Sequence, residues 1–327
     1  MIPEEKKAAV NHALNMAFGV SEFEEIQEMT AGLSSARIYR ILISGKPYLL
    51  RIIMRTDAMG DPTIHFACMK AGADAGIAPH VWYAGIEDRI AITDFIDAKP
   101  FPMDAARIKM PDIIKRLHAL PAFPFRLNYL DFVDKSIVKF QEAQIIPDHI
   151  TRDIFTEYEK ISDIYPRTGP DLVSCHNDLK PENVLYDGER VWLVDWEGAF
   201  LNDRYLDLAV VANFVVTNDG QEMDFLKRYF GKEASEYQLA RFFLMQQILH
   251  MAYFVFLLTI STHGKSIDPD FMKEDFREFH NLMWGGKITL ETDEVRQRYA
   301  LVHMEQLRLN FKRKRFEKSL KIVSDHK

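Results

Sequence analysis

The chain has 327 residues, of which 47% are hydrophobic and 27% charged, and its formal net charge is −7. This balance is typical of a folded protein with more than one domain and excludes extensive disorder. The acidic charge argues against nucleic acid as the main partner, because binding a phosphate backbone requires clustered Lys and Arg. Two cysteines, Cys68 and Cys175, are too few for a disulfide framework and predict free thiols in a reducing, cytoplasmic setting.

Residues 1–95 are expected to form a small mixed sheet with one inserted helix. The N-terminal residues 4–17 predict a helix and lack the long apolar core of a secretory signal. The segment ILISGKPYLLRII has two β-rich runs around a Ser-Gly-Lys-Pro turn, which predicts a hairpin. Residues 62–76 predict a helix with Asp61 as its N-cap. The runs HVWYAGI and RIAITDFI then predict a second hairpin.

Residues 96–327 are expected to form a second, mostly helical domain. One β-rich insert is expected at residues 172–195, and the chain shows no internal repeat. The apolar stretch 242–260 is nearly long enough to span a bilayer, but it contains Gln246, Gln247 and His250, which are costly in lipid. It is therefore expected to be a buried helix, without integral membrane association. The helices are expected at residues 103–119, 129–145, 150–163, 203–217, 235–260, 270–284 and 292–320.

The segment SCHNDLKPENVLYDGERVWLVDWEGAFLNDRYLDLA carries the most informative chemistry. A polar loop containing Asp178 and Asn183 lies between short β-rich runs, and the Asp-Gly turn at 187–188 predicts a hairpin whose return strand ends at Asp195. The hairpin is expected to fold the two acids toward each other. Phosphoryl transfer requires metal ions on the phosphates and a carboxylate that orients and deprotonates the acceptor hydroxyl. Mg²⁺ prefers hard oxygen ligands, which Asn183 and Asp195 offer, and Asp178 is suited to be the base.

The spacing His-x-Asp-x-x-x-x-Asn, followed by Asp after the next strand, resembles the catalytic signature of the protein-kinase-like superfamily. The detailed pattern CHND, PEN, DWE and ND…DLA resembles the choline/ethanolamine kinase and aminoglycoside phosphotransferase group, and within it the bacterial choline kinases. The resemblance extends from about residue 31 to residue 209. It implies an α+β, two-lobed protein-kinase-like fold. The N-lobe, residues 1–95, would hold an antiparallel sheet and one main helix, and the C-lobe, residues 96–327, would be larger and mostly helical.

The resemblance also implies roles for the loop residues. Asp178 matches the catalytic base, and Asn183 and Asp195 match the metal ligands, so the cofactors implied are ATP and Mg²⁺. His176 matches a residue that organises the loop. Lys180 is suited to neutralise charge on the transferred phosphoryl group. Asp207 matches an acid that usually supports the catalytic loop, and we group it with the residues on the substrate side.

The nucleotide is expected to bind residues 1–95. Arg51 occupies the position of the phosphate-contacting Lys and can still clamp phosphate oxygens. No acid is found between Ile64 and Ala73 to pair with it, and His65 lies near the expected position. The remaining nucleotide contacts are expected from the turn with Gly32, Ser34 and Ser35 and from the interlobe segment Asp94, Phe95 and Ile96.

The acceptor is expected to be a small, cationic alcohol. A quaternary ammonium group binds well in a cage of aromatic rings. Trp196, Tyr253 and Trp284 are the candidate rings, although large apolar side chains usually belong to the core. Glu197 is either a substrate contact or an acid that favours a helix N-terminus. The basic C-terminal helix either contacts an anionic partner or is a solvated face.

Three other functions are weighed against a choline- or ethanolamine-type kinase. An aminoglycoside or other sugar-type kinase would share the motifs. A catalytically inactive nucleotide-binding protein would explain the missing N-lobe acid. A protein kinase is disfavoured, because the segment between Asp195 and Asp207 is too short for a peptide-binding activation segment. The sequence leaves open the acceptor's identity and whether the chain forms a homodimer.

Overall fold

The computed structural model describes residues 2–29, 36–57, 60–268 and 274–326. The chain divides into two compact units, which are described separately. Unit 1 comprises Met1–Phe101, Phe123–Phe125 and Asn183–Ala199, and unit 2 comprises Pro102–Ala122, Arg126–Glu182 and Phe200–Lys327. The first crossing between units therefore lies a few residues after the expected boundary at 95, and part of the motif segment belongs to unit 1.

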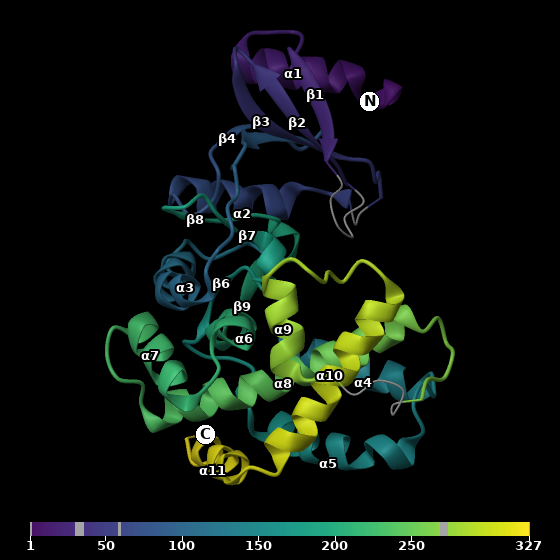
Figure 1. The fold of residues 1–327 in the computed structure, drawn as a ribbon, viewed down its shortest axis with the longest axis vertical. Helices are drawn as coiled ribbons and strands as arrows, with labels where there is room; N and C mark the ends of the chain where they lie inside the picture. Colours follow the sequence, from purple (N-terminus) through teal and green to yellow (C-terminus); the bar gives the residue numbers. More distant parts are fainter. Residues whose placement is uncertain (1, 30–35, 58–59, 269–273, 327) are drawn as a thin grey trace. The chain divides into compact units, whose positions relative to one another are not determined.

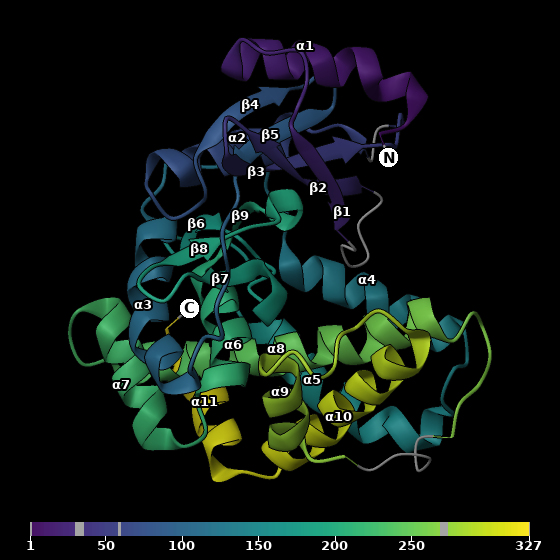
Figure 2. The ribbon, with the colours of Figure 1, turned by 45° about the horizontal axis from the view of Figure 1, so that its top comes forward.

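Unit 1 is built on a five-stranded antiparallel sheet in the order β1-β2-β3-β5-β4. Helix α1 contacts β4 and β5, and Figure 2 shows it running across them. The expected hairpin between β2 and β3 is confirmed, with its turn at Ser44 and Gly45 in the left-handed conformation. Strand β1 was not predicted, because its sequence EIQEM is polar and mostly exposed. The elements are α1 (Lys7–Phe18), β1 (Glu25–Met29), β2 (Ala36–Ile43), β3 (Lys46–Ile53), α2 (Thr63–Asp74), β4 (Val81–Gly85) and β5 (Ile90–Asp94).

Three further elements of unit 1 come from the motif segment. Strands β7 (Val184–Tyr186) and β8 (Val191–Leu193) form the expected antiparallel hairpin. The short helix η4 (Trp196–Gly198) follows and packs on α2. Gly72 of α2 makes this possible, because a Cβ atom there would lie 2.5 Å from the Trp196 ring.

Unit 2 is mostly helical and has one two-stranded antiparallel sheet, β6–β9. Helix α7 was not predicted, because its sequence is largely polar. The single helix expected over 292–320 is wrong: the extended backbone of Arg313 separates α10 from α11. The elements are α3 (Met103–His118), α4 (Tyr129–Glu142), α5 (Asp148–Ile164), β6 (Leu172–Cys175), η3 (Pro181–Asn183), β9 (Phe200–Asp203), α6 (Arg204–Val215), α7 (Asp219–Phe230), α8 (Glu236–Ser261), α9 (Phe276–Trp284), α10 (Asp293–Phe311) and α11 (Lys314–Ser324).

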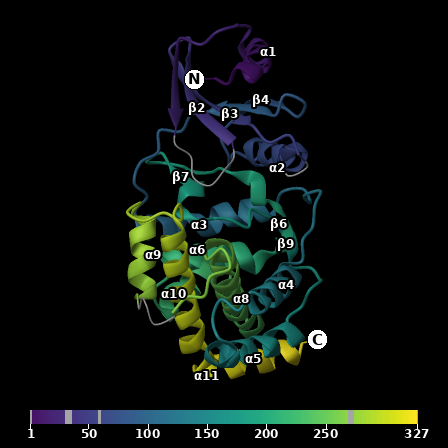
Figure 3. The same ribbon diagram turned by 90° about the vertical axis from the view of Figure 1, so that its right-hand side faces the viewer.

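Helix α8 forms the centre of unit 2. It is the one described helix long and apolar enough to cross a membrane, yet 72% of its most apolar 18-residue window is buried within the protein. It contacts α4, α5, α6, α10 and α11, and Figure 3 shows these helices gathered around it. A capping box between Ser235 and Gln238 defines its first turn. These contacts agree with the expected buried helix.

The basic C-terminal helix α11 also belongs to this packing. Phe316 and Val323 are buried, and the helix packs against α8 and α5. Of its cations, Arg315 pairs with Glu222, and Lys318 Nζ lies 2.8 Å from a carboxylate oxygen of Glu236. Acids of α7 and α8 thus neutralise part of the basic face, which favours a structural role over an anionic partner.

Three buried histidines gather where α8, α9 and α10 meet. Nδ1 of His250 lies 2.8 Å from Nδ1 of His303, and Nε2 of His280 lies 3.1 Å from the Tyr299 hydroxyl. All three imidazoles are almost inaccessible to solvent. Burial lowers the pKa of His250 and of His280 to about 3, and burial together with the two neighbouring imidazoles lowers the pKa of His303 well below the usual 6.5. The native protein therefore holds this cluster neutral.

We expect this cluster to make the protein sensitive to acid. Below pH 6.5 the unfolded chain binds protons that the native cluster cannot accept. The free energy of unfolding therefore decreases as the pH is lowered, by about 1.4 kcal/mol per pH unit for each histidine. Urea unfolding between pH 7.5 and 4.5 measures this slope. Replacing the exposed His149 by Gln should leave the slope unchanged, whereas His303→Phe should reduce it. Equal slopes in all three proteins would contradict the assignment.

Candidate active site

The loop that carries Asp178 begins where strand β6 ends, in unit 2. Strand β6 pairs with β9, which the sequence did not predict, rather than with the β7–β8 hairpin. Just beyond β6, the backbone N–H groups of His176 and Asn177 donate to the two carboxylate oxygens of Asp207, at 2.9 and 2.7 Å. Nε2 of His118 lies 3.1 Å from the same carboxylate. Asp207 thus fixes the start of the loop through these hydrogen bonds.

The full burial of Asp207 corrects its grouping with the substrate residues. The carboxylate is inaccessible to solvent and already has three partners from the protein. A substrate cannot reach it without breaking the loop apart. The contacts agree instead with the supporting role that the resemblance implied. His176 is likewise fully buried and meets Asp207 through its backbone.

Asp178 itself is partly exposed and follows a sharp turn. Asn177 has φ +65°, in the left-handed region that non-glycine residues rarely adopt. The turn leaves 39% of the Asp178 side chain accessible, and Lys180 Nζ lies 2.9 Å from its Oδ2. The carboxylate is therefore open to a ligand, and a cation stands beside it.

Arg51 of β3 finds its acidic partners within unit 1, although not on helix α2. Its Nη1 lies 3.3 Å from Asp195 Oδ1, and its Nη2 pairs with Glu197. Both acids follow strand β8, and Asp195 is itself in the left-handed conformation. No acid lies between Ile64 and Ala73 of α2. At His65, burial and the nearby Arg51 charge lower the imidazole pKa to about 4. His65 is therefore neutral near pH 7, and Glu197 supplies the missing charge.

Asn183 and Trp196 flank these acids in the chain. Asn183 is buried, and its carbonyl accepts from the backbone N–H of Val194 at 3.0 Å, which fixes the start of the hairpin to its end. Trp196 is 3% exposed and packs edge-on against Phe123 as well as on Gly72. This burial assigns Trp196 to packing and corrects its expected place in an aromatic cage.

The expected nucleotide contacts fall on both described and undescribed residues. Gly32, Ser34 and Ser35 lie outside the described residues. In the segment after β5, the backbone N–H of Asp94 already donates to the His80 carbonyl at 2.9 Å, and its carboxylate accepts from Trp82 Nε1 at 2.8 Å. The backbone N–H and the carboxylate of Asp94 thus already have partners within unit 1. Phe95 and Ile96 are partly exposed, and their contact with adenine stays a prediction.

Three tyrosines of unit 2 lie within electrostatic reach of Asp178. Burial raises the pKa of Tyr129, and the Asp178 charge raises it further. Burial likewise raises the pKa values of Tyr253 and Tyr299, and the charges of Asp178 and Glu182 add to both effects. Tyr253 and Tyr299 lie 5.4 Å apart between ring centroids. Of this group the sequence suggested only Tyr253.

Trp284, the third candidate ring, lies at the end of α9. Its ring packs against Phe214, with centroids 6.0 Å apart. The side chain is partly exposed, so its expected substrate contact stays a prediction. Asp178 belongs to unit 2, whereas Asn183 and Asp195 belong to unit 1, and the expected grouping of all three also stays a prediction.

The fold and the loop define a class before any particular relative is considered: a kinase-like phosphotransferase fold. A family model described as the phosphotransferase enzyme family matches residues 25–243, which is more than half of the chain. The chain belongs to this family.

Parts of the chain are similar to individual curated proteins. Protein LicA of Haemophilus influenzae is 33% identical over 98 residues, covering 30% of this chain and 26% of the relative. A LicA homolog of Mycoplasma capricolum is 23% identical over 154 residues, covering 47% of this chain and 63% of the relative. These alignments span less than two thirds of the relatives' own length.

Solved structures agree on the fold over nearly the whole chain. A choline/ethanolamine kinase family protein of Mesorhizobium loti has a TM-score of 0.70 at 18% identity, covering 98% of this chain and 99% of its own. Choline kinase LicA of Streptococcus pneumoniae has a TM-score of 0.60 at 16% identity, covering 93% and 100%. A streptomycin–ATP complex of the phosphotransferase APH(2")-IIa has a TM-score of 0.56 at 17% identity, covering 78% and 92%. The two-lobed, kinase-like α+β fold expected from the motifs is confirmed.

Proposed function

We propose that this protein transfers the γ-phosphoryl group of ATP to the hydroxyl of a small amino alcohol such as choline or ethanolamine. The observation that carries the proposal is the surroundings of Asp178: a partly exposed carboxylate beside Lys180, within reach of three tyrosines. The similarity of this chain to a choline/ethanolamine kinase family protein and to a choline kinase supports the same acceptor class.

Asp178 is proposed as the base. Its carboxylate accepts the proton of the acceptor hydroxyl and orients the oxygen toward the phosphoryl group. Lys180 Nζ lies 2.9 Å from Asp178 Oδ2, and its ammonium group is proposed to neutralise charge on the transferred phosphoryl group. Arg51 is proposed to contact phosphate oxygens of the nucleotide, with Glu197 keeping its guanidinium in place.

The metal expected with the nucleotide fits the oxygen donors of unit 1. Asn183 offers an amide oxygen and Asp195 a carboxylate, and Glu197 adds a second carboxylate two residues after Asp195. Such hard oxygen donors, few in number, suit Mg²⁺, which retains water and phosphate ligands. Bound Mg²⁺ would neutralise charge on the β- and γ-phosphates.

The acceptor class follows from charge and aromatic rings together. The carboxylate of Asp178 contributes negative potential around Tyr129 and Tyr253, whose side chains are partly exposed. A cation is attracted to both features, because aromatic faces and carboxylates each stabilise positive charge. An acceptor with an ammonium group and a nearby hydroxyl would satisfy the site.

A panel of acceptors tests the proposal. ADP release with ATP and Mg²⁺ is measured for choline, ethanolamine, the uncharged carbon isostere of choline, an aminoglycoside and a neutral sugar. We expect turnover with an amino alcohol, and about tenfold lower kcat/KM with the uncharged isostere, since cation–π contacts contribute about 0.5–2 kcal/mol. If only the aminoglycoside or only the sugar were phosphorylated, the proposed acceptor class of amino alcohols would be wrong. Nucleotide binding without any transfer would favour an inactive binding protein.

The metal assignment has its own test in Asp195→Asn. We expect the Mg²⁺ concentration for half-maximal turnover to rise by about tenfold or more, the range typical of lost metal-site interactions. Calorimetry of nucleotide binding with and without Mg²⁺ should show the same loss without relying on activity. Glu87→Gln, which removes an exposed acid of unit 1, is the matched control. Identical Mg²⁺ dependence in both variants would remove Asp195 from the metal site.

A further inference from the structure

The direction of the Asp178 side chain depends on an unusual backbone angle one residue earlier. Asn177 has φ +65°, and such a conformation costs free energy for any residue with a Cβ atom. Asparagine tolerates it better than most residues, but surrounding contacts must still maintain it. What holds Asn177 therefore also aims Asp178.

The side chain of Asn177 is tied at both ends. Its Nδ2 donates to the carbonyls of Cys175 and Phe200, at 3.3 and 3.4 Å. Its Oδ1 accepts from Nδ2 of Asn202 at 2.8 Å, the shortest of the three contacts. The two carbonyls belong to the paired strands β6 and β9, where Cys175 lies opposite Phe200. Asn177 thus bridges the strand pair, and Asn202 closes the bridge.

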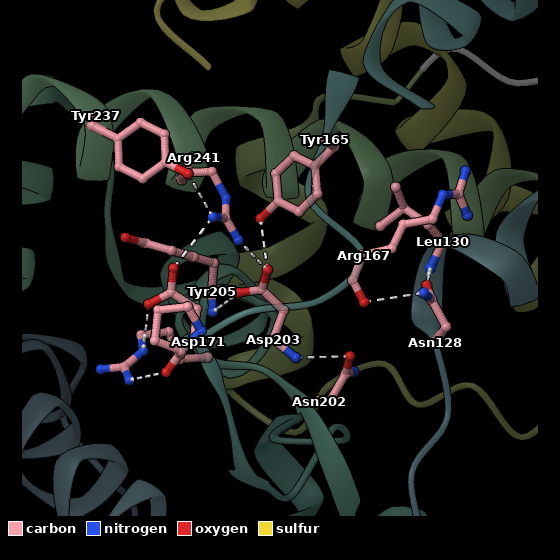
Figure 4. A network of polar contacts seen from close by, with 12 residues as sticks. Asn128, Leu130, Tyr165, Arg167, Asp171, Asn202, Asp203, Tyr205, Tyr237 and Arg241 are labelled. Carbon is pink, nitrogen blue, oxygen red and sulfur yellow. Dashed lines mark hydrogen bonds and ion pairs between the residues drawn. The ribbon is translucent and has the colours of Figure 1, made fainter. Parts of the chain in front are cut away.

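Asn202 cannot choose another orientation easily. It is 2% exposed, and its Oδ1 accepts from the backbone N–H of Asp203 at 2.8 Å, a contact drawn in Figure 4. If the amide were turned over, its nitrogen would face that N–H, and its oxygen would face Oδ1 of Asn177. Both contacts would be lost, so the donor must point at Asn177.

Strand β9, which carries Asn202, is fixed at its next residue by a buried ion pair. Asp203 accepts from Arg241 and from the Tyr165 hydroxyl, and it caps α6 through the N–H of Tyr205 (Figure 4). Arg241 is 3% exposed and also reaches Asp171, at 3.2 Å. Asn202 therefore projects from a fixed point.

We propose that Asn202 is a positioning residue: by hydrogen bonding to Asn177 it maintains the left-handed turn that directs Asp178 toward the acceptor. The proposal rests on the proposed function for the identity of the base. It predicts that removing the buried amide of Asn202 alters the rate of transfer rather than the binding of ATP.

Asn202→Ala tests the rate. We expect kcat to fall about 100-fold, the size of effect that follows from a small misplacement of a catalytic group, with KM for ATP changed less than about twofold. Asn213→Ala is the matched control, because Asn213 is a buried asparagine of the same unit whose amide nitrogen has no partner among the described residues. Its kcat should equal that of the wild type. An unchanged kcat in Asn202→Ala would overturn the proposal.

A double variant tests whether Asn202 acts through Asn177. Asn177→Gly permits the positive φ but no longer enforces it, since glycine adopts positive and negative φ about equally well, and the variant also loses the side-chain bridge. We expect Asn177→Gly and Asn202→Ala to lower kcat to a similar extent, and the double variant to be no worse than either. Fully additive losses would mean that Asn202 acts elsewhere, and would contradict the proposal.

Hydrogen exchange decides the question without any acceptor. In Asn202→Ala, backbone amides from His176 to Leu179 should exchange faster than in the wild type, while amides of α8 and the melting temperature change little. The Asn213→Ala control should match the wild type throughout. Unaltered exchange in the loop would refute the positioning role even if no acceptor were phosphorylated. Faster exchange in a protein without turnover would retain the role of Asn202 and reject the proposed function.

Discussion

Replacing Asp178 by Asn is expected to lower kcat by roughly 10³-fold while leaving nucleotide affinity nearly unchanged. A general base contributes about 10²- to 10⁴-fold in such reactions, and the amide keeps the size of the side chain but cannot accept a proton. The backbone contacts of the loop to Asp207 do not involve the Asp178 side chain, so the fold should survive. Steady-state kinetics with the best acceptor, together with calorimetry of ATP binding, measure both quantities.

The matched control for this variant is Asp224→Asn. Asp224 lies on α7 in an exposed ion pair with Arg228, where such pairs contribute little to stability. Its kcat should match that of the wild type. If Asp178→Asn retained a tenth or more of the wild-type kcat, Asp178 would not be the base.

The second large effect concerns stability and is expected at Arg241. The guanidinium of Arg241 is buried among Asp171, Asp203 and Tyr237 (Figure 4). Arg241→Met removes the positive charge but keeps much of the apolar volume, which leaves Asp203 buried without its ion-pair partner. Breaking one side of a buried ion pair typically costs about 3–5 kcal/mol. Urea unfolding at pH 7.5 should show a loss of this size.

The double variant Arg241→Met/Asp203→Asn provides the control. With both charges gone, the uncompensated carboxylate disappears, and part of the stability should return. Burial already raises the pKa of Asp203 against the opposing charge of Arg241. In the single variant the carboxyl should therefore protonate more easily, and the loss should be smaller at pH 5 than at pH 7.5. A single variant that costs less than about 1 kcal/mol would contradict the role given to the ion pair.

The sequence predicted those parts of the fold whose pattern is local. Both hairpins of the sheet, the helix after Asp61 and the apolar helix through Phe242–Ile260 follow from turn residues, caps and periodicity, and all are present. Strand β1 and helix α7 were missed, because their residues are polar and their burial depends on neighbours distant in the chain. The break at Arg313 was missed because the packing of α11 on α8 and α5 depends on residues distant in the chain.

The candidate site shows the same division. The spacing of Asp178, Asn183 and Asp195 could be read directly, since it is a property of one short segment. The partner of Arg51 could not, because Glu197 lies 146 residues further along the chain and replaces an acid expected on α2. Tyr129 and Tyr299 carry no motif, and only the packing of α4 and α10 in unit 2 brings them within reach of Asp178. Trp196 was wrongly assigned to the aromatic cage, because the type of a residue does not show whether its side chain is buried.

The most direct test of the account is phosphorus NMR of the purified protein with ATP, Mg²⁺ and a single amino alcohol. We predict that the γ-phosphate signal of ATP decreases while signals of ADP and of a phosphomonoester of the alcohol increase in equal amounts, and that Asp178→Asn abolishes this exchange. Release of inorganic phosphate alone, or a phosphomonoester formed equally well by Asp178→Asn, would contradict it.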